Sequence, residues 1–209
     1  MFRRLNLTAA LLASLAAPVH GQVQVGLSTF AGGFLPVGEL FEELRLAGQI
    51  VANVSQDPAP AVGGRVTVWM SRFAIDAEVG YAFSNVDLPS AIVDLGLDNR
   101  ASVLVGSVNV LYVFYQAPFS PLSIYVSGGG GLVSRSGEFF DIFQGTTDVA
   151  GSLGIGFRFG LGRATRLRFD VRDYISSFAP TRRDDEFDSM LQNDVIATVG
   201  LEFVLRPVE

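Results

Sequence analysis

The chain has 209 residues, with 15 basic and 21 acidic side chains and a formal net charge of −6 at pH 7, and its length fits one domain or two small ones. The acidic balance excludes the basic surface that binds nucleic acid, and the absence of cysteine excludes disulfide bonds. Hydrophobic residues make up 49% of the sequence, yet no run of about 18 apolar residues predicts a membrane-spanning helix.

Residues 1–21 have the pattern of a secretory signal peptide. Arg3 and Arg4 form the charged start, an apolar stretch follows, and small residues precede a cleavage site after Gly21. A membrane anchor is the alternative, which the shortness of the apolar stretch disfavours. Cleavage leaves residues 22–209 with 13 arginines, no lysine and 21 acids, a formal charge of −8. We therefore expect an exported protein.

Eight segments follow in which apolar residues alternate with small or polar ones, which is the period of a β-strand. They are residues 22–32, 62–70, 73–83, 102–114, 121–133, 147–160, 164–176 and 194–205. The connections alternate in length: those around Ser71, Pro118 and Gly162 are short, and the long ones are 33–61, 84–101, 134–146 and 177–193. Short periplasmic turns, long extracellular loops and an even strand number are typical of outer-membrane barrels. The sequence therefore predicts an all-β fold, an eight-stranded antiparallel up-and-down transmembrane β-barrel formed by residues 22–209.

The aromatic residues distinguish this barrel from its alternative, a soluble sandwich or lipocalin-like barrel. Among the apolar positions of the alternating segments, one group of aromatic residues lies at the barrel end that bears the short turns. These residues are Phe73, Tyr112, Phe114, Phe157, Phe159 and Phe203. Tyr81 and Phe83 fall at the opposite end. A membrane barrel carries aromatic girdles at both interfaces, whereas a soluble core has no reason to sort aromatic side chains by height. The first group is therefore predicted to be a periplasmic-side girdle.

The small and polar parity of the same strands carries most of the charge. It holds five arginines and five acids, namely Arg65, Arg158, Arg166, Arg168, Arg172, Asp76, Glu78, Asp148, Asp170 and Glu202. Side chains fill the interior of an eight-stranded barrel, and buried charges there must be paired. We predict that these ten residues form a charge network in a largely plugged lumen. A gated or selective conduit is the alternative.

Two further local patterns predict specific geometry. A hairpin turning at Ser71 and Arg72 would pair Met70 with Phe73 and, on the inner face, Arg65 with Glu78; because this turn lacks Gly and Asn, a wider loop is the alternative. The glycines of residues 128–131 favour a bend or close packing over an opening.

Two features depart from the simple pattern. The first long connection, 33–61, contains apolar residues that predict either a short helix after Pro36 or an extension of the flanking strands. Asp173, within the charged stretch "RLRFDVRDYISSF", falls on the lipid parity. A carboxylate there requires a place near the outer interface or a bulge around Arg172.

The segments "GSLGIGFRFGLGRATRLRFDVRDY" and "VIATVGLEFVL", with the eight alternating stretches, resemble the small outer-membrane β-barrel proteins of the OmpA-like and opacity type. The resemblance covers most of residues 22–205. It implies a monomeric or weakly associated barrel of the cell outer membrane, surrounded by lipid and lipopolysaccharide and inserted by the outer-membrane assembly machinery. Family members serve as anchors, adhesins, lipid enzymes or narrow channels. The chain departs from the family in ending beyond Phe203 rather than on an aromatic residue.

Catalytic and metal-binding side chains are sparse. The single histidine, His20, lies in the predicted signal, and cysteine is absent, so the mature chain lacks the usual general base and soft-metal ligands. We predict no enzyme, no cofactor and no metal site, with a lipid-modifying enzyme as the alternative. The acidic stretch 182–188 is expected to be a solvated loop; Ca²⁺ or divalent-bridged lipopolysaccharide is its alternative partner. A structural or surface-interaction role is predicted, with a narrow channel as the main alternative.

Overall fold

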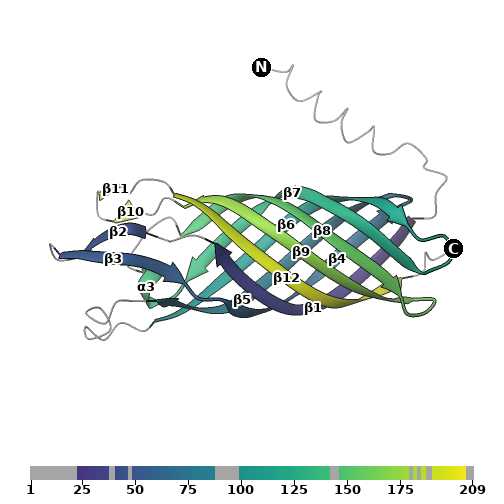
Figure 1. Cartoon of the computed structure of the whole chain (residues 1–209), viewed down its shortest axis with the longest axis horizontal. Helices are drawn as coiled ribbons and strands as arrows, with labels where there is room; N and C mark the ends of the chain where they lie inside the picture. Colours follow the sequence, from purple (N-terminus) through teal and green to yellow (C-terminus); the bar gives the residue numbers. More distant parts are fainter. Residues whose placement is uncertain are drawn as a thin grey trace, which may run out of the picture.

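The computed structural model describes residues 23–37, 41–46, 49–87, 99–141, 146–178, 181–182, 185–186 and 190–205. Nearly all of them lie in β-strands, which wind obliquely around one long axis (Figure 1). The predicted signal, residues 1–21, lies outside the described residues, as do all of the side chains of the acidic stretch 182–188.

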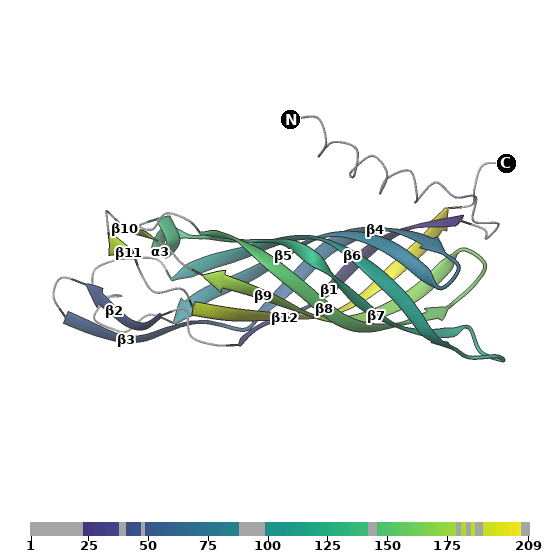
Figure 2. The same cartoon turned by 90° about the horizontal axis from the view of Figure 1, so that it is seen from above.

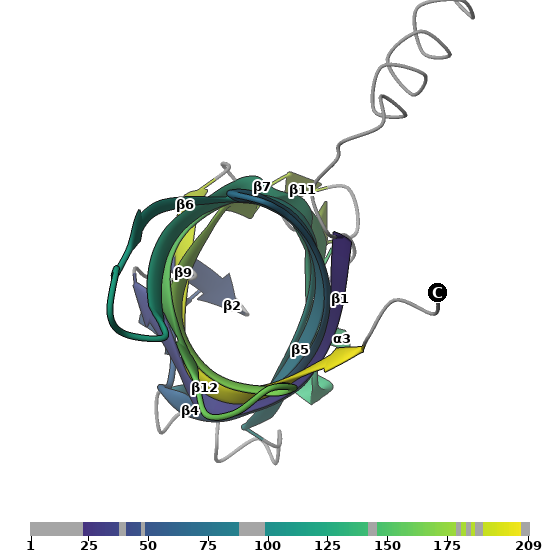
Figure 3. The same ribbon diagram turned by 90° about the vertical axis from the view of Figure 1, so that its right-hand side faces the viewer.

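Eight long antiparallel strands form the barrel. They are β1 (Val23–Val37), β4 (Ala59–Met70), β5 (Phe73–Asp87), β6 (Arg100–Gln116), β7 (Leu122–Ser136), β8 (Thr147–Gly160), β9 (Thr165–Phe178) and β12 (Met190–Leu205). Each pairs with its neighbour in sequence, and β1 also pairs with β12, from Val25 opposite Leu205 to Val37 opposite Asn193. Seen end-on, the strands make a complete ring (Figure 3). The predicted eight-stranded antiparallel barrel is therefore confirmed.

The connections differ between the two ends of the barrel. Three short turns join β4 to β5, β6 to β7 and β8 to β9, at the end where β1 begins and β12 ends. The small elements lie at the opposite end (Figures 1 and 2). They are β2 (Phe41–Leu46), β3 (Gln49–Gln56), α3 (Glu138–Asp141), β10 (Thr181–Arg182) and β11 (Asp185–Glu186). This confirms the predicted alternation of short and long connections.

Most strands extend beyond their predicted ends, chiefly toward the long connections. β1 continues to Val37, β5 to Asp87, and β12 already begins at Met190. About 9–11 residues cross a bilayer, so strands of 12 to 17 residues project past it at one end. Apolar alternation fades there because neither face meets lipid. The 33–61 connection also continues in β-strands, because it contains the β2–β3 hairpin. The predicted alternative of a helix after Pro36 is therefore wrong.

The β4–β5 hairpin has the predicted register, with Met70 opposite Phe73 and Arg65 opposite Glu78. Its turn contains only two residues, and Ser71 takes a φ of 59°. A positive φ at the first central residue alone is the pattern of a type II′ turn, which normally places Gly there. The alternative of a wider loop is therefore wrong, and a serine occupies the left-handed position.

The glycine run in β7 allows two strands to approach closely. A Cβ added at Gly131 would collide with the Gly106 carbonyl oxygen on β6 and lie 2.8 Å from Ser107 Cβ. A Cβ at the neighbouring Gly130 would meet nothing nearer than the Ala150 carbonyl oxygen, at 3.5 Å. The inward-facing glycines of this run therefore serve close packing, as the sequence predicts.

The outer face of the barrel is apolar and exposed. Val79, Val108 and Leu153 leave 58%, 58% and 61% of their surface uncovered, which would be unfavourable in water but suits lipid. The aromatic residues predicted for the girdle, Phe73, Tyr112, Phe114, Phe157, Phe159 and Phe203, are all exposed on this face. Phe73 and Tyr112 touch, with ring centroids 5.1 Å apart. Among the residues that the structure describes, no helix is both long and apolar enough to span a membrane.

Candidate functional site

The middle of the lumen, meaning the barrel interior, holds six charged side chains in one connected cluster. We call it the central network; its members are Arg65, Asp76, Glu78, Arg168, Asp170 and Arg172. All six are buried, and Arg168 and Asp76 have an exposed fraction of 0%. They come from β4, β5 and β9. The inward-facing positions of these strands carry charged residues at about the same height along the barrel axis.

Arg168 forms ion pairs with two acids of the network and with Glu202 beside it. Its Nη1 lies 3.4 Å from Asp76 Oδ1 and 3.4 Å from Glu202 Oε2, and its Nη2 lies 3.3 Å from Asp170 Oδ1. Its Nε donates a hydrogen bond to the Tyr125 hydroxyl at 3.1 Å. A planar guanidinium can bond several carboxylates at once, and here it joins carboxylates from β5, β9 and β12.

Arg65 and Arg172 complete the pairing. Arg65 bonds both Glu78 and Asp170, while Arg172 lies 2.9 Å from Glu78 Oε2 and 2.6 Å from Asp76 Oδ2. Each of the three acids in the network therefore contacts two or more arginines. This multiple pairing offsets the large cost of removing charges from water.

Uncharged polar side chains also bond to the network, although the buried Arg172 Nε has no hydrogen-bond partner among the described residues. Tyr125 donates to Asp170 Oδ1 at 2.7 Å, and Tyr174 donates to Glu78 Oε1 at 2.8 Å. Thr67 donates to Asp76 Oδ1 at 2.5 Å, and Thr198 accepts from Arg65 at 2.8 Å. A buried carboxylate with several donors and a charged partner has no need of water.

A second layer lies toward the short turns and meets the central network through Glu202. Glu202 lies 3.4 Å from Arg158 and 3.5 Å from Arg166. Arg158 also stacks over the Trp69 ring, 3.8 Å from its centroid. The Arg158 and Arg166 side chains are 14% and 20% exposed, so this layer, unlike the middle of the lumen, meets solvent.

Toward the long connections the lumen becomes apolar and then charged again. The apolar layer consists of Phe34, Ala59, Ala61, Ala82, Val103, Val105, Val133, Ala150, Tyr174 and Ile196. Beyond it, Arg135 pairs with Asp194 at 2.5 Å and with Asp148 at 3.3 Å. The interior is therefore layered along the axis, with an apolar layer between two charged ones.

Nine of the ten residues predicted to form the lumen network lie in one connected set of ion pairs, and Asp148 does not. Asp148 instead belongs to the separate group around Arg135. Sequence reasoning missed both Arg135 and Asp194. Arg135 lies two residues beyond the predicted end of its strand, so extending the alternation by one step would have found it. Asp194 is the first residue of its predicted strand and stands on the same parity as Glu202, so the alternation already placed it inward.

Asp173 keeps the outward parity. Pairing runs along both sides of β9 without a register shift, so the predicted alternative of a bulge around Arg172 is wrong. Asp173 is half-buried, and its carboxylate accepts a hydrogen bond from the Asn193 amide at 3.3 Å. It lies near the end of the barrel that bears the long connections, which agrees with a place at the outer interface.

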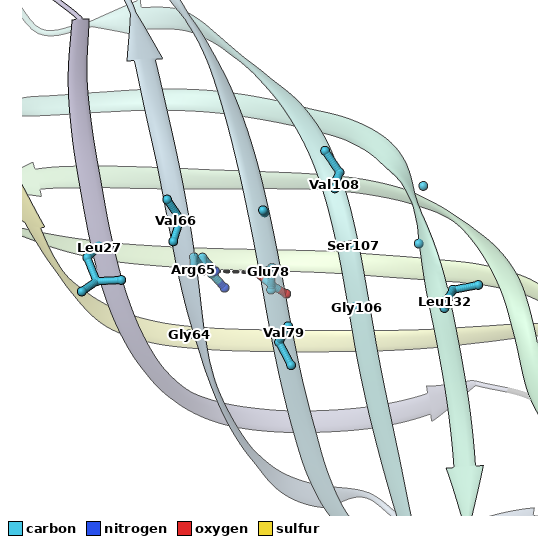
Figure 4. A pocket seen from close by; sticks show the side chains of 13 residues that line it. Leu27, Gly64, Arg65, Val66, Glu78, Val79, Gly106, Ser107, Val108 and Leu132 are labelled. Atoms are coloured by element: carbon cyan, nitrogen blue, oxygen red, sulfur yellow. Dashed lines mark hydrogen bonds and ion pairs between the residues drawn. The ribbon is translucent and has the colours of Figure 1, made fainter.

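The outer face also bears a shallow groove of about 670 Å³ across β1, β4, β5, β6 and β7. Figure 4 shows Leu27, Val66 and Val79 around it, with the Arg65–Glu78 ion pair between β4 and β5. Because both members of that pair are buried, the groove does not open into the lumen. Most of its lining residues are apolar or glycine.

Three solved structures share this fold. Neisserial surface protein A matches with a TM-score of 0.59 and 10% identity, over 86% of this chain and 96% of that one. The outer membrane protein AlkL in lipid bilayers matches with a TM-score of 0.60 and 19% identity, over 90% and 93%. The outer membrane protein OprG from Pseudomonas aeruginosa matches with a TM-score of 0.57 and 11% identity, over 89% and 98%. No family model and no curated protein matches the sequence.

At these identities the likeness concerns the fold. That fold, together with the exposed apolar belt, is the one by which small proteins span the bacterial outer membrane. The chain is an outer-membrane β-barrel.

Proposed function

We propose that this barrel has a structural or surface-interaction role in the outer membrane and that its lumen is closed. The observation that carries the proposal is the burial of the central network, in which Arg168 and Asp76 are 0% exposed and Arg172 is 1% exposed. These three side chains therefore leave 1% or less of their surface to solvent. Ions cross a pore through water or through groups that replace their hydration shell, and every polar partner here is a fixed protein group.

The apolar layer beyond the network supports the same proposal. Phe34, Val103 and Val133 are 0% exposed, so they pack against one another rather than line a channel. An ion would have to cross both this layer and the ion pairs below it. A narrow channel for ions or small solutes is the alternative, and it would require the network to open.

The proposed role is not enzymatic. Residues 22–209 contain neither histidine nor cysteine, and the buried carboxylates of the network are held by arginines rather than offered to a substrate. If the barrel were instead a lipid-modifying enzyme, incubation with lipopolysaccharide would change the acyl content that mass spectrometry records.

Conductance across a planar bilayer tests whether the lumen is closed. We expect the refolded protein to give no steady single-channel steps under conditions in which a porin conducts. We expect Arg168→Ala to permit transient openings, because it leaves Asp76, Asp170 and Glu202 short of a partner. The outward-facing Val171→Ala is the matched control on the same strand and should stay silent.

The contrary result is equally clear. Steady steps from the unaltered protein that change in size or ion selectivity with Arg168→Ala, but not with Val171→Ala, would place the conducting path through the network. The channel alternative would then replace the closed lumen.

A further inference from the structure

A second groove, of about 420 Å³, lies on the outer face at the end of the barrel that bears the long connections. β5, β6 and β7 form its walls, and its lining includes Tyr81, Phe83, Arg100, Ser102 and Ser136. These residues stand on the parity that faces away from the lumen. The groove therefore opens toward the membrane and its outer boundary.

The chemistry of the groove changes stepwise along the barrel axis. In the row nearest the middle of the barrel, Tyr81 stands opposite Leu104. In the next, Phe83 stands opposite Ser102, which in turn faces Ser136. In the outermost row, Asn85 stands opposite Arg100. The lining thus passes from apolar, through aromatic and hydroxyl, to amide and cationic over about 13 Å of strand.

Arg100 gives this groove a cation. Among the side chains that the structure describes, it is the only arginine on the outer face at this end. The other two outward arginines, Arg72 and Arg163, are in the short turns at the opposite end. Arg100 is exposed. It also interacts within the protein, but a guanidinium has five N–H donors and can bond a second anion.

The aromatic pair below Arg100 suits the boundary between lipid tails and headgroups. The Tyr81 and Phe83 rings meet edge to face with centroids 4.9 Å apart, and they are 38% and 56% exposed. Aromatic side chains at this level of a membrane protein pack against the upper part of acyl chains and the headgroup region.

We propose that this groove is a binding site for a phosphorylated lipid of the outer leaflet, lipopolysaccharide. A phosphate of its headgroup binds Arg100, where a charge-assisted hydrogen bond forms. Asn85, Ser102 and Ser136 offer hydrogen bonds to sugar hydroxyls, and an acyl chain packs along Phe83 and Tyr81. The gradient from apolar to cationic along the axis matches an amphiphile standing along the bilayer normal.

The proposal rests on the outer-membrane position of the barrel but not on a closed lumen, so it and the conductance test fail independently. The test is native mass spectrometry of the refolded protein released from detergent micelles, without divalent cations. The probes are diphosphorylated lipid A and the same lipid after enzymatic removal of its phosphates. The variants are Arg100→Ala, Arg100→Lys, Phe83→Ala and, as the matched arginine at the other end, Arg163→Ala.

We expect the unaltered protein and Arg163→Ala to retain one diphosphorylated lipid A with the same affinity. Arg100→Ala should bind it about 10- to 150-fold more weakly, since a hydrogen bond to a charged group contributes about 1.5–3 kcal/mol. Arg100→Lys should lie between, because it keeps the charge without the fork. Phe83→Ala should weaken binding of both forms of the lipid.

Equal binding by Arg100→Ala and Arg163→Ala, or equal binding of both forms of lipid A by the unaltered protein, would overturn the proposal. A protein dimer that forms without lipid and is lost in Phe83→Ala would overturn it in favour of a second copy in the groove. Heat-modifiable gel migration of each variant establishes that it is folded, and Arg100→Lys keeps the test decisive if Arg100→Ala does not fold.

Discussion

The inner and outer faces of β9 follow different rules although they alternate along the same backbone. On the inner face, Arg168 and Asp170 each contact several named partners at defined distances. On the outer face, Val171 is simply exposed. Lipid accepts any apolar shape, whereas a buried charge requires particular partners. The inner face therefore requires particular residues at particular positions, whereas the outer face requires only apolar residues.

Removing an inner charge should have the largest effect. Arg168→Ala leaves three acids with one fewer partner, and we expect a loss of about 3–5 kcal/mol in the free energy of unfolding. Urea-dependent unfolding in lipid vesicles, followed by heat-modifiable migration, measures it. On the outer face of the same strand, Val171→Ala should cost about 1 kcal/mol or less. Equal losses for the two variants would remove the distinction between the faces.

Adjacent glycines provide the next comparison, because Gly131 faces inward and Gly130 outward. Gly131→Ala puts a methyl group against the backbone of β6, and we expect it to cost about 1–3 kcal/mol through overpacking. Gly130→Ala meets only ordinary contacts and should leave stability unchanged or slightly raised. The same unfolding assay applies, and a larger loss for Gly130→Ala would show that the outer face near these glycines packs against something other than fluid lipid.

The smallest expected effect concerns the exception on the outer face, Asp173. Asp173→Asn keeps a hydrogen-bond acceptor for the Asn193 amide but removes a charge from the lipid-facing parity. We expect a gain of at most about 1 kcal/mol, as for a charge near the interface. A clear loss of stability would instead show that the Asp173 charge has a favourable partner at the outer rim.

Much of the candidate site follows from the alternation alone. The alternation along β4, β5 and β9 is enough to predict that Arg65, Asp76 and Arg168 face inward, since successive side chains of a strand point to opposite faces. The alternation did not place Arg135, because the outward-facing positions are no longer consistently apolar where the strands leave the bilayer. Polar residues there stand on both faces, and the end of the strand cannot be read from hydropathy.

The cross-strand pair Arg65–Glu78 was also accessible from sequence, because a tight turn at Ser71 and Arg72 sets the register of a hairpin. The choice of Ser71 for a left-handed position was not. Gly is the usual residue there, and a serine is accepted because the ladder pairs next to the turn hold it in place.

The amino-acid sequence by itself determined the strand period, the two faces and the alternation of short and long connections, because these depend on residues close together in the chain. Only the tertiary structure decided which arginine meets which acid. Arg65 and Asp170 are 105 positions apart and come from strands that are not neighbours in the sheet. Their contact depends on how β1 closes onto β12 and on the stagger of the strands around the ring. The layering of the lumen has the same origin, since the height of a side chain is set by the whole closed barrel.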